Sequence, residues 1–317
     1  MKIIAITGGT GFVGGALARA ALTRGYTPRI LTRKNPSQPL KGAQYRLVDF
    51  ADKKTLADAL DGALYVVHLA AALFCRSQEE FESANASGTA NMVAACDKTL
   101  SLKKLIYLSS LAAGGPSNDP SKPRSEPDSD APVSFYGKSK LGGEIAVKTL
   151  QNIPYVILRP PIIYGKNDSG TPSQMASWVK KGIMANAGSG NAMFSFVYLD
   201  DLVNALFKAL ETDNLSGKTY YVCENTTYHW KQFITMLAEA MGVKMPIMLT
   251  LPPKAMYYAG WLYEILSKLT GAQPVFNRDK AREGSAPNWT ASSAAWEKDA
   301  GWQGWTSLEE GIKKTFS

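Results

Sequence analysis

An apolar strand pattern that runs into a glycine-rich turn and then into a helical pattern opens this chain. Residues 3–14 read IIAITGGTGFVG. A strand, a tight turn and a helix N-terminus in this order direct free backbone N–H groups at a phosphate, and glycines let the backbone approach it closely. Glycines without this context could equally form a turn that binds no ligand. With the strand and helix around it, the segment predicts a nucleotide-phosphate cradle made by Gly8, Thr10, Gly11, Phe12, Val13 and Gly14.

Apolar strand patterns alternate with helical patterns through the first half of the chain. Such alternation is typical of a doubly wound parallel sheet, a Rossmann-type α/β fold. We expect a cofactor domain over residues 1–165, with 199–222 packing back onto it, and a smaller, mostly helical substrate-binding region over 166–198 and 223–317. A proline-rich stretch at 114–132 predicts a long loop at the active edge. The expected strands are 2–7, 29–32, 45–48, 65–69, 105–109 and 155–158.

Charge indicates which nucleotide is bound. The first 48 residues contain eight Lys and Arg and no Asp or Glu, so they carry a charge equal to the net +8 of the whole chain. An NAD-binding unit usually has an acid after its second strand, where it meets the ribose 2′-hydroxyl. Arg33 and Lys34 stand there instead, and a guanidinium can grip a 2′-phosphate. The sequence predicts NADP(H), with NAD(H) as the alternative.

Composition excludes several other classes of protein. With 45% apolar and 20% charged residues the chain is an ordinary globular protein. Its three cysteines are widely spaced, which favours a reduced cytoplasm and no metal site, and Cys75 is expected to be a buried thiol rather than a substrate contact. No run of basic residues predicts a nucleic-acid-binding arm, and no apolar stretch reaches membrane-spanning length. A strand begins the chain, so we expect no signal peptide.

An aromatic-rich segment at 255–266, AMYYAGWLYEIL, stands out in the C-terminal part. A core-facing helix is the simplest interpretation of it. The wall of an apolar substrate pocket and a patch resting on a membrane surface are the alternatives.

Tyr136 and Lys140 begin a helical pattern just after the proline-rich loop. Four residues apart, they lie on one helix face. A phenol has an ordinary pKa near 10, and a neighbouring ammonium together with a cationic nicotinamide should lower the pKa of Tyr136 enough for proton transfer. The strand at 105–109 ends in two hydroxyls, of which Ser110, or Ser109 in its place, could orient a substrate oxygen.

With these residues in place, the chain resembles the extended short-chain dehydrogenase/reductase superfamily, the NAD(P)-dependent epimerase/dehydratase family, over essentially its whole length. Gly8, Gly11 and Gly14 match that family's glycine motif. By the same resemblance Tyr136 is the acid/base, Lys140 lowers its pKa and holds the nicotinamide ribose, and Ser110 positions the reacting oxygen.

The resemblance also implies further cofactor contacts. Asp49 and Phe50 are similar to the pair that meets the adenine, and the segment His68-Leu69-Ala70-Ala71 to the one that lies under the cofactor. Asn85 matches a mainly architectural asparagine, and the stretch after Arg159 resembles the segment flanking the nicotinamide. The implied cofactor-binding residues are Asp49, Phe50, Leu69, Ala70, Ala71, Tyr136, Lys140, Pro160 and Ile163, in addition to the cradle and Arg33 and Lys34.

One departure from the pattern separates the branches. Nucleotide-sugar enzymes of this superfamily usually carry an Arg-Asp-Phe triplet where this chain has Phe194-Ser195-Phe196, so the guanidinium that grips a diphosphate is missing. The loop after Ser110 and the C-terminal tail look more like the 3β-hydroxysteroid dehydrogenase-like branch. We therefore expect an NADP(H)-dependent oxidoreductase that acts on an alcohol or ketone of a largely apolar, sterol-like substrate.

Two alternatives remain open. A nucleotide-sugar epimerase or dehydratase would return the hydride within one turnover, and a non-catalytic cofactor-binding subunit would stabilise a larger assembly. Expected partners are a small-molecule substrate and, at most, a second copy of the chain, without nucleic acid or a membrane span; peripheral membrane contact is left open.

Overall fold

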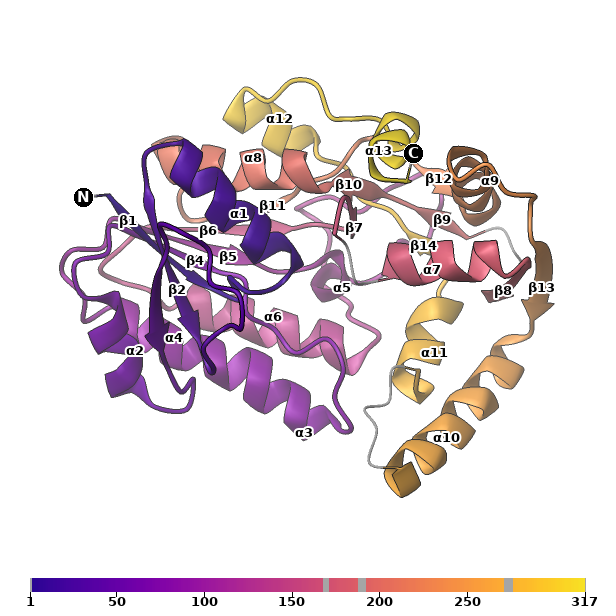
Figure 1. Cartoon of the computed structure of the whole chain (residues 1–317), viewed down its shortest axis with the longest axis horizontal. Helices are drawn as coiled ribbons and strands as arrows, with labels where there is room; N and C mark the ends of the chain where they lie inside the picture. The colour runs from indigo at the N-terminus through magenta and orange to yellow at the C-terminus, as the bar shows by residue number, and fades with distance from the viewer. Residues whose placement is uncertain (1, 168–170, 188–191, 271–275, 317) are drawn as a thin grey trace.

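A seven-stranded parallel sheet forms the centre of the protein among the residues that the computed structural model describes, which are 2–167, 171–187, 192–270 and 276–316 (Figure 1). All six predicted strands are present within one or two residues of the expected bounds, and a seventh, unpredicted strand extends one edge. In spatial order the strands are β11 (Lys218–Tyr221), β6 (Tyr155–Arg159), β5 (Lys104–Leu108), β4 (Tyr65–His68), β1 (Ile3–Thr7), β2 (Thr27–Thr32) and β3 (Gln44–Leu47). The predicted doubly wound α/β fold is confirmed.

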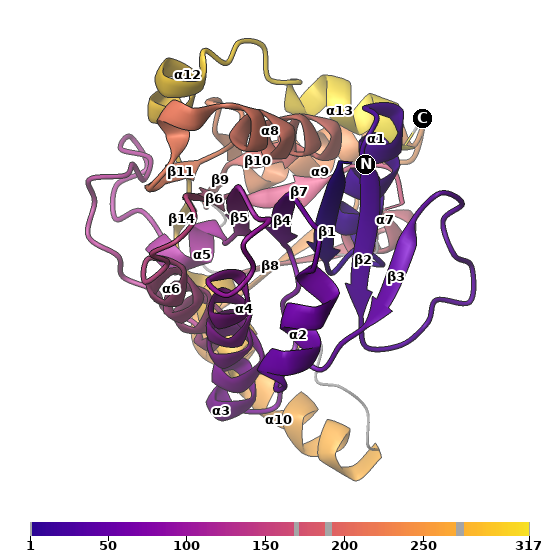
Figure 2. The same cartoon turned by 90° about the vertical axis from the view of Figure 1, so that its left-hand side faces the viewer.

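Helices cover both faces of this sheet (Figure 2). Side chains alternate along each strand, so Ile4 and Ile6 of β1 pack on one face and Ile3 and Ala5 on the other. The first face is covered by α1 (Phe12–Thr23) and α8 (Leu199–Glu211), and the second by α2 (Lys53–Leu60), α4 (Gly88–Cys96) and α6 (Phe135–Val147). Helix α8 packs beside α1.

Shorter elements lie at the carboxyl edge of the sheet. They are α3 (Gln78–Phe81), which runs into a π-helical turn (Glu82–Ser87), and α5 (Leu111–Gly114). Between α5 and α6 the chain forms no helix and only an isolated β-bridge from Arg124 to Ala291. The predicted long loop is therefore confirmed.

The C-terminal part builds a second apolar core around α7 (Thr171–Lys180), α9 (Trp230–Ala240) and α13 (Leu308–Phe316). Three small sheets border it, and α10 (Pro253–Thr270), α11 (Arg278–Ser285) and α12 (Ala294–Ala300) complete the region (Figure 1). The small sheets pair β7 (Ile162–Tyr164) with β10 (Phe196–Tyr198), β8 (Ile183–Ala187) with β13 (Ile247–Leu251), and β9 (Met193–Phe194) with both β12 (Tyr228–His229) and β14 (Asn288–Trp289).

Burial corrects one expectation and agrees with another. The aromatic segment 255–266 lies in α10, and most of its large side chains are exposed, so the core-facing interpretation is wrong. Cys75, Cys96 and Cys223 are all buried free thiols, as was expected for Cys75. Within the described part of the chain, no helix combines the length and the apolar character needed to cross a membrane.

Candidate active site

The glycine turn between β1 and α1 has the geometry of a phosphate cradle. Gly8 has a positive φ of 67°, and a Cβ there would lie 3.0 Å from the amide nitrogen of Ala70. A Cβ on Gly14 would collide with the carbonyl oxygen of Gly8. Helix α1 starts after Gly11 with no side-chain cap and no acid in its first turn, so the positive helix end is left open for an anion. Thr10 is exposed at the turn, and Phe12 and Val13 are half-buried. A dinucleotide pyrophosphate fits this cradle.

A buried hydrogen-bond chain supports the segment 69–71 that borders the cradle. Thr7 Oγ1 accepts from the backbone nitrogens of Leu69 and Ala70, both at 3.0 Å, and lies 2.7 Å from His68 Nδ1. On the other side of the ring, His68 Nε2 lies 3.0 Å from Thr89 Oγ1, whose own proton goes to the carbonyl oxygen of Asn85. The histidine therefore donates from Nε2 and accepts at Nδ1. Burial, with a smaller contribution from Lys140, lowers the pKa of His68 to about 3, so the ring is neutral.

The ends of β2 and β3 carry the residues expected at the adenosine. Arg33 and Lys34 follow β2, are exposed, and form no ion pair within the described residues. Asp49 follows β3, is exposed, and accepts a hydrogen bond from the backbone of Ala51; Phe50 is half-buried beside it. By contrast Arg29, inside β2, is buried and donates to the carbonyl oxygens of Ala59 and Asp61. The cations available to a 2′-phosphate are thus those after the strand.

Tyr136 and Lys140 lie one turn apart on α6, as predicted. Ser134 caps the helix by accepting from the backbone nitrogen of Gly137. Tyr136 is half-buried, and burial raises the pKa of its phenol; Glu283 raises it further, and a hydrogen bond with Ser110 lowers it. Lys140 is buried, donates to the carbonyl oxygen of Leu108 at 2.8 Å and lies over the Tyr107 ring.

The predicted electrostatic role of Lys140 takes a different form in the structure. Burial lowers the pKa of its ammonium to about 7, and Glu144 opposes this shift. The Lys140 Nζ is directed to a main-chain oxygen. Burial is the largest influence on the pKa of Tyr136 and raises it, whereas the predicted lowering depends on the ammonium and on a bound nicotinamide together. Lys140 is therefore held by a main-chain oxygen one helical turn from Tyr136, with the pKa of its ammonium lowered by burial.

The two strand-end serines have different partners. Ser109 is buried and donates to the Glu144 carboxylate at 2.5 Å. Ser110 caps α5 by accepting from the nitrogen of Ala112 at 3.1 Å, and its hydroxyl also faces Tyr136. Ser110, rather than the fallback Ser109, is thus the hydroxyl that the structure brings to the phenol.

Glu144 is a site residue that the sequence prediction missed. It is fully buried on α6, one turn beyond Lys140, and holds Arg159 through two contacts, at 2.8 Å to Nε and 2.6 Å to Nη2. Asp130 pairs with the same guanidinium at 2.7 Å. The i, i+4, i+8 spacing of Tyr136, Lys140 and Glu144 was the available signal. The guanidinium of Arg159 is thus paired with carboxylates of the protein itself. The two cofactor contacts implied after it lie nearby in sequence: the carbonyl oxygen of Pro160 accepts from the nitrogen of Leu111, and Ile163 is half-buried on β7.

Helix α11 brings further charged residues to the start of α6, and their contacts were not predicted from the sequence. Asp279 accepts from the backbone nitrogen of Phe135 with both carboxylate oxygens, at 2.9 and 3.0 Å, and so fixes the start of α6. Lys280 Nζ lies 5.3 Å from the centre of the Tyr136 ring. The C-terminal part therefore contacts the predicted catalytic helix directly.

Asn85 ties the helices beside the site together. Its amide nitrogen donates to Ala72 O and Ser139 Oγ, and its amide oxygen accepts from Ala72 N at 2.7 Å. The residue lies in the π-helical turn, a local deviation often found at functional sites. These contacts fit the architectural role that the resemblance implied.

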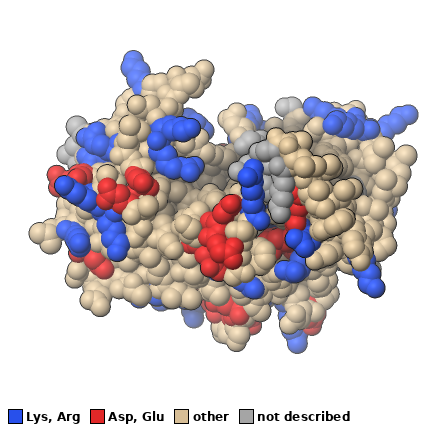
Figure 3. All heavy atoms as spheres, turned by 90° about the horizontal axis from the view of Figure 1, so that it is seen from below, with Lys and Arg blue, Asp and Glu red and all other residues tan. Residues whose placement is uncertain are grey.

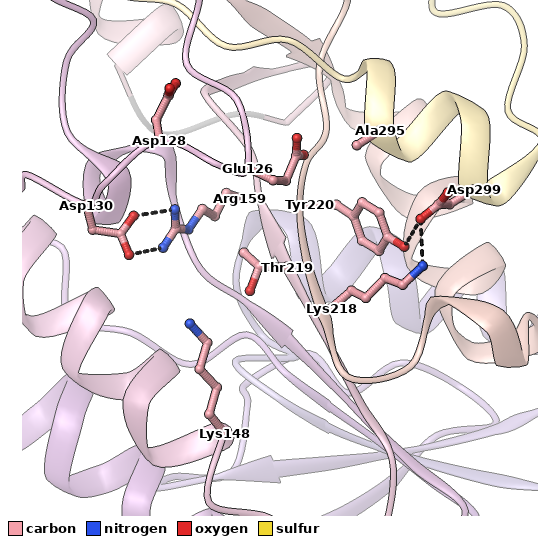
Figure 4. Close-up of a pocket in the computed structure, with 10 residues that line it drawn as sticks. All are labelled: Glu126, Asp128, Asp130, Lys148, Arg159, Lys218, Thr219, Tyr220, Ala295 and Asp299. Atoms are coloured by element: carbon pink, nitrogen blue, oxygen red, sulfur yellow. Dashed lines mark hydrogen bonds and ion pairs between the residues drawn. The ribbon is translucent and has the colours of Figure 1, made fainter.

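A charged pocket of about 400 Å³ lies at the β11 edge of the sheet, and Figure 4 shows its lining. The Arg159–Asp130 pair stands at one end, and Lys218 with Tyr220 contacts Asp299 at the other. None of the residues predicted for catalysis or cofactor binding lines it. Its charges are largely paired with one another, so we assign it no role in the reaction.

Comparisons with known proteins agree with the geometry. The model of the NAD dependent epimerase/dehydratase family matches residues 4–223. The chain is 30% identical to the ceramide reductase of Caulobacter vibrioides, over 92% of this chain and 87% of that protein. It is 27% identical to the 2-alkyl-3-oxoalkanoate reductase of Stenotrophomonas maltophilia, over 99% and 98%.

A solved structure extends the likeness to the fold of the whole chain. The UDP-glucose 4-epimerase of Thermotoga maritima, solved with UDP-glucose, is 21% identical and superposes with a TM-score of 0.79 over 99% of this chain and 97% of that one. The chain therefore belongs to the NAD-dependent epimerase/dehydratase family of the extended short-chain dehydrogenase/reductases and is an NAD(P)-dependent enzyme of that type.

Proposed function

We propose that this enzyme is an NADP(H)-dependent oxidoreductase that interconverts a ketone and a secondary alcohol on an apolar substrate. The observation that carries the proposal is Phe194, which stands where nucleotide-sugar enzymes usually carry their diphosphate-binding arginine. Its ring packs 5.1 Å from Trp230 and joins the apolar cluster that also contacts Tyr136. An aromatic ring in place of the guanidinium, on the same apolar cluster as the phenol, favours an alkyl substrate over a charged nucleotide sugar.

In this proposal each residue of the triad has one task. Ser110 donates a hydrogen bond to the substrate carbonyl and fixes its position. Tyr136 gives its phenolic proton to the same oxygen as the carbonyl carbon is reduced. Lys140, when protonated, stabilises the phenolate that remains. Bound NADPH would supply the hydride.

The NADP(H) preference rests on Arg33 and Lys34. Both side chains are exposed at the end of β2 and free of ion pairs in the described structure, and no acid stands beside them in sequence. A 2′-phosphate would gain two cations there, whereas a 2′-hydroxyl would find no carboxylate.

The substrate class follows from the two reductases. Their names give a ceramide and a 2-alkyl-3-oxoalkanoate, both of which carry alkyl chains. We therefore favour an open-chain lipid ketone over a sterol ring, and we propose that residues 166–198 and 223–317 bind the chains. The bonds formed and broken at the carbonyl are the same for either substrate.

The deciding experiment combines the purified enzyme with NADPH or NADH and, separately, with 2-alkyl-3-oxo esters, ketosteroids and UDP-sugars. It follows the absorbance of the reduced nicotinamide and analyses the UDP-sugars for conversion. We expect net oxidation of NADPH that falls by about 10²-fold or more in Tyr136→Phe. Tyr155→Phe, the same change at a half-buried phenol at the start of β6, the strand end away from the site, serves as the matched control. Conversion of a UDP-sugar without net cofactor change would replace this proposal with the epimerase, and inactivity on all substrates despite cofactor binding would favour the non-catalytic subunit.

A further inference from the structure

Helix α10 projects from the body of the molecule and packs on it mainly through α11 (Figures 1 and 2). Its inward side is formed by small and polar residues. Gly260 is buried so closely that a Cβ would lie 2.7 Å from the backbone of Asn277, and Ser267 is buried on the same side. Glu264 reaches the backbone nitrogen of Arg278 at 2.8 Å. The helix is thus anchored through its least apolar face.

The opposite face of α10 is apolar and exposed. At 3.6 residues per turn its members occupy about half of the circumference. Leu269 is 79% exposed and Tyr258 65%. A helix in a globular protein normally buries its apolar stripe, so this arrangement is reversed. We call this surface the outer face of α10; it consists of Tyr258, Trp261, Leu262, Ile265, Leu266 and Leu269.

Helix α10 and the segment that precedes it carry a net positive charge. Glu264 is the only acid of α10, and Arg278 neutralises it with an ion pair of 2.8 Å. Lys254 in the first turn and Lys244 just before β13 are exposed and form no ion pair among the described residues. In Figure 3, which looks from below, uncharged atoms dominate the right-hand end of the molecule, the end at which Figure 1 places α10.

We propose that the outer face of α10 docks the enzyme on the surface of an anionic phospholipid bilayer. Tyr and Trp are the residues that settle at the interface between headgroups and acyl chains, and the leucines and isoleucine would enter the acyl boundary. Lys254 and Lys244 would meet anionic headgroups, where each cation adds attraction. A protein partner would need an acidic surface opposite these cations, and no observation in the described part of the chain points to such a partner.

Docking would hold the active site close to the lipid surface. Helix α11, on which α10 packs, fixes the start of α6 through Asp279 and sets Lys280 over Tyr136. Helices α10 and α11 therefore lie between the outer face and the phenol. The advantage of this placement rests on the proposed function, since a lipid ketone is held in the same bilayer to which the enzyme binds.

The test is sedimentation of the full chain with vesicles. We expect the protein to pellet with phosphatidylcholine vesicles that contain about one quarter phosphatidylglycerol, and far less with phosphatidylcholine alone. The double variant Leu262→Ser/Leu266→Ser should lower the partition coefficient by about tenfold or more. Leu47→Ser/Leu100→Ser makes the same change at two exposed leucines elsewhere and should leave it unaltered.

Three results would overturn the proposal. The wild-type protein could stay in the supernatant with both kinds of vesicle, a result that does not depend on how any variant folds. The control variant could lose binding as much as the α10 variant. Sedimentation equilibrium could show a dimer that the α10 variant dissociates while no vesicle binds, which would make the face a subunit interface. Activity of the wild-type enzyme on a water-soluble 3-oxo ester tests the proposed function separately.

Discussion

Replacing Glu144 with glutamine should destabilise the enzyme through the core rather than through the reaction. The carboxylate is fully buried and accepts from Ser109 and twice from Arg159, whose side chain is only 4% exposed. Breaking a buried ion pair on one side typically costs about 3–5 kcal/mol. Asp130 remains with Arg159, and the amide oxygen can still accept, so we expect a smaller loss, about 2–3 kcal/mol.

Urea unfolding followed by circular dichroism measures this loss. The control is Glu310→Gln, which makes the same change in an ion pair of similar length, 2.7 Å, whose two side chains are 57% and 50% exposed. Exposed pairs contribute less than about 1 kcal/mol, and salt screens them. Equal midpoint shifts in the two variants, at unchanged slope, would refute the view that burial gives the Glu144 pair its importance.

Three further outcomes are expected. Gly14→Ala should abolish NADPH binding in a fluorescence titration, because its Cβ would strike Gly8 O. Gly15→Ala, whose Cβ comes no closer to its neighbours than 3.5 Å, should retain NADPH binding. Arg33→Ala should weaken NADPH binding by about tenfold and leave NADH binding unchanged, since only the 2′-phosphate is lost as a partner; equal weakening of both cofactors would contradict this. Burial lowers the pKa of His68 from 6.5 to about 3, so between these two pH values the unfolded chain binds a proton at this histidine and the folded chain does not. The free energy of unfolding therefore falls as the pH falls, by about 3 kcal/mol between pH 6.5 and 4. His68→Gln should remove this contribution to the pH dependence of the free energy of unfolding, measured by urea unfolding at a series of pH values. His229→Gln, at the other histidine, should leave it in place.

The sheet was predictable because its strands are apolar runs separated by helical patterns. The six predicted strands match because each, apart from the edge strand β3, is an apolar run that the sheet buries. Strand β11 was missed, since KTYY is a short edge strand with no distinctive pattern.

The site was predictable only where function constrains local sequence. The glycines follow from the backbone geometry of the turn, and the Tyr136–Lys140 spacing follows from the helix period. The contacts of Glu144 with Arg159 and of Asp279 with α6 join residues far apart in the chain, and no local pattern specifies them. The orientation of α10 was equally hidden, because composition shows that a helix is apolar but not which way its apolar face points.

A π-helical turn holds one residue more than the α-helical turn it replaces. Between Phe81 and Gly88 that additional residue lets Asn85 reach Ala72 and Ser139 together. Deleting any single residue of the turn would restore α-helical winding and rotate the asparagine by about 100° relative to one side of the helix. A one-residue gap in a relative's alignment at this turn would therefore signal the loss of the asparagine's contacts even where the asparagine itself is retained. The number of residues in this turn therefore matters for these contacts as much as the asparagine itself does.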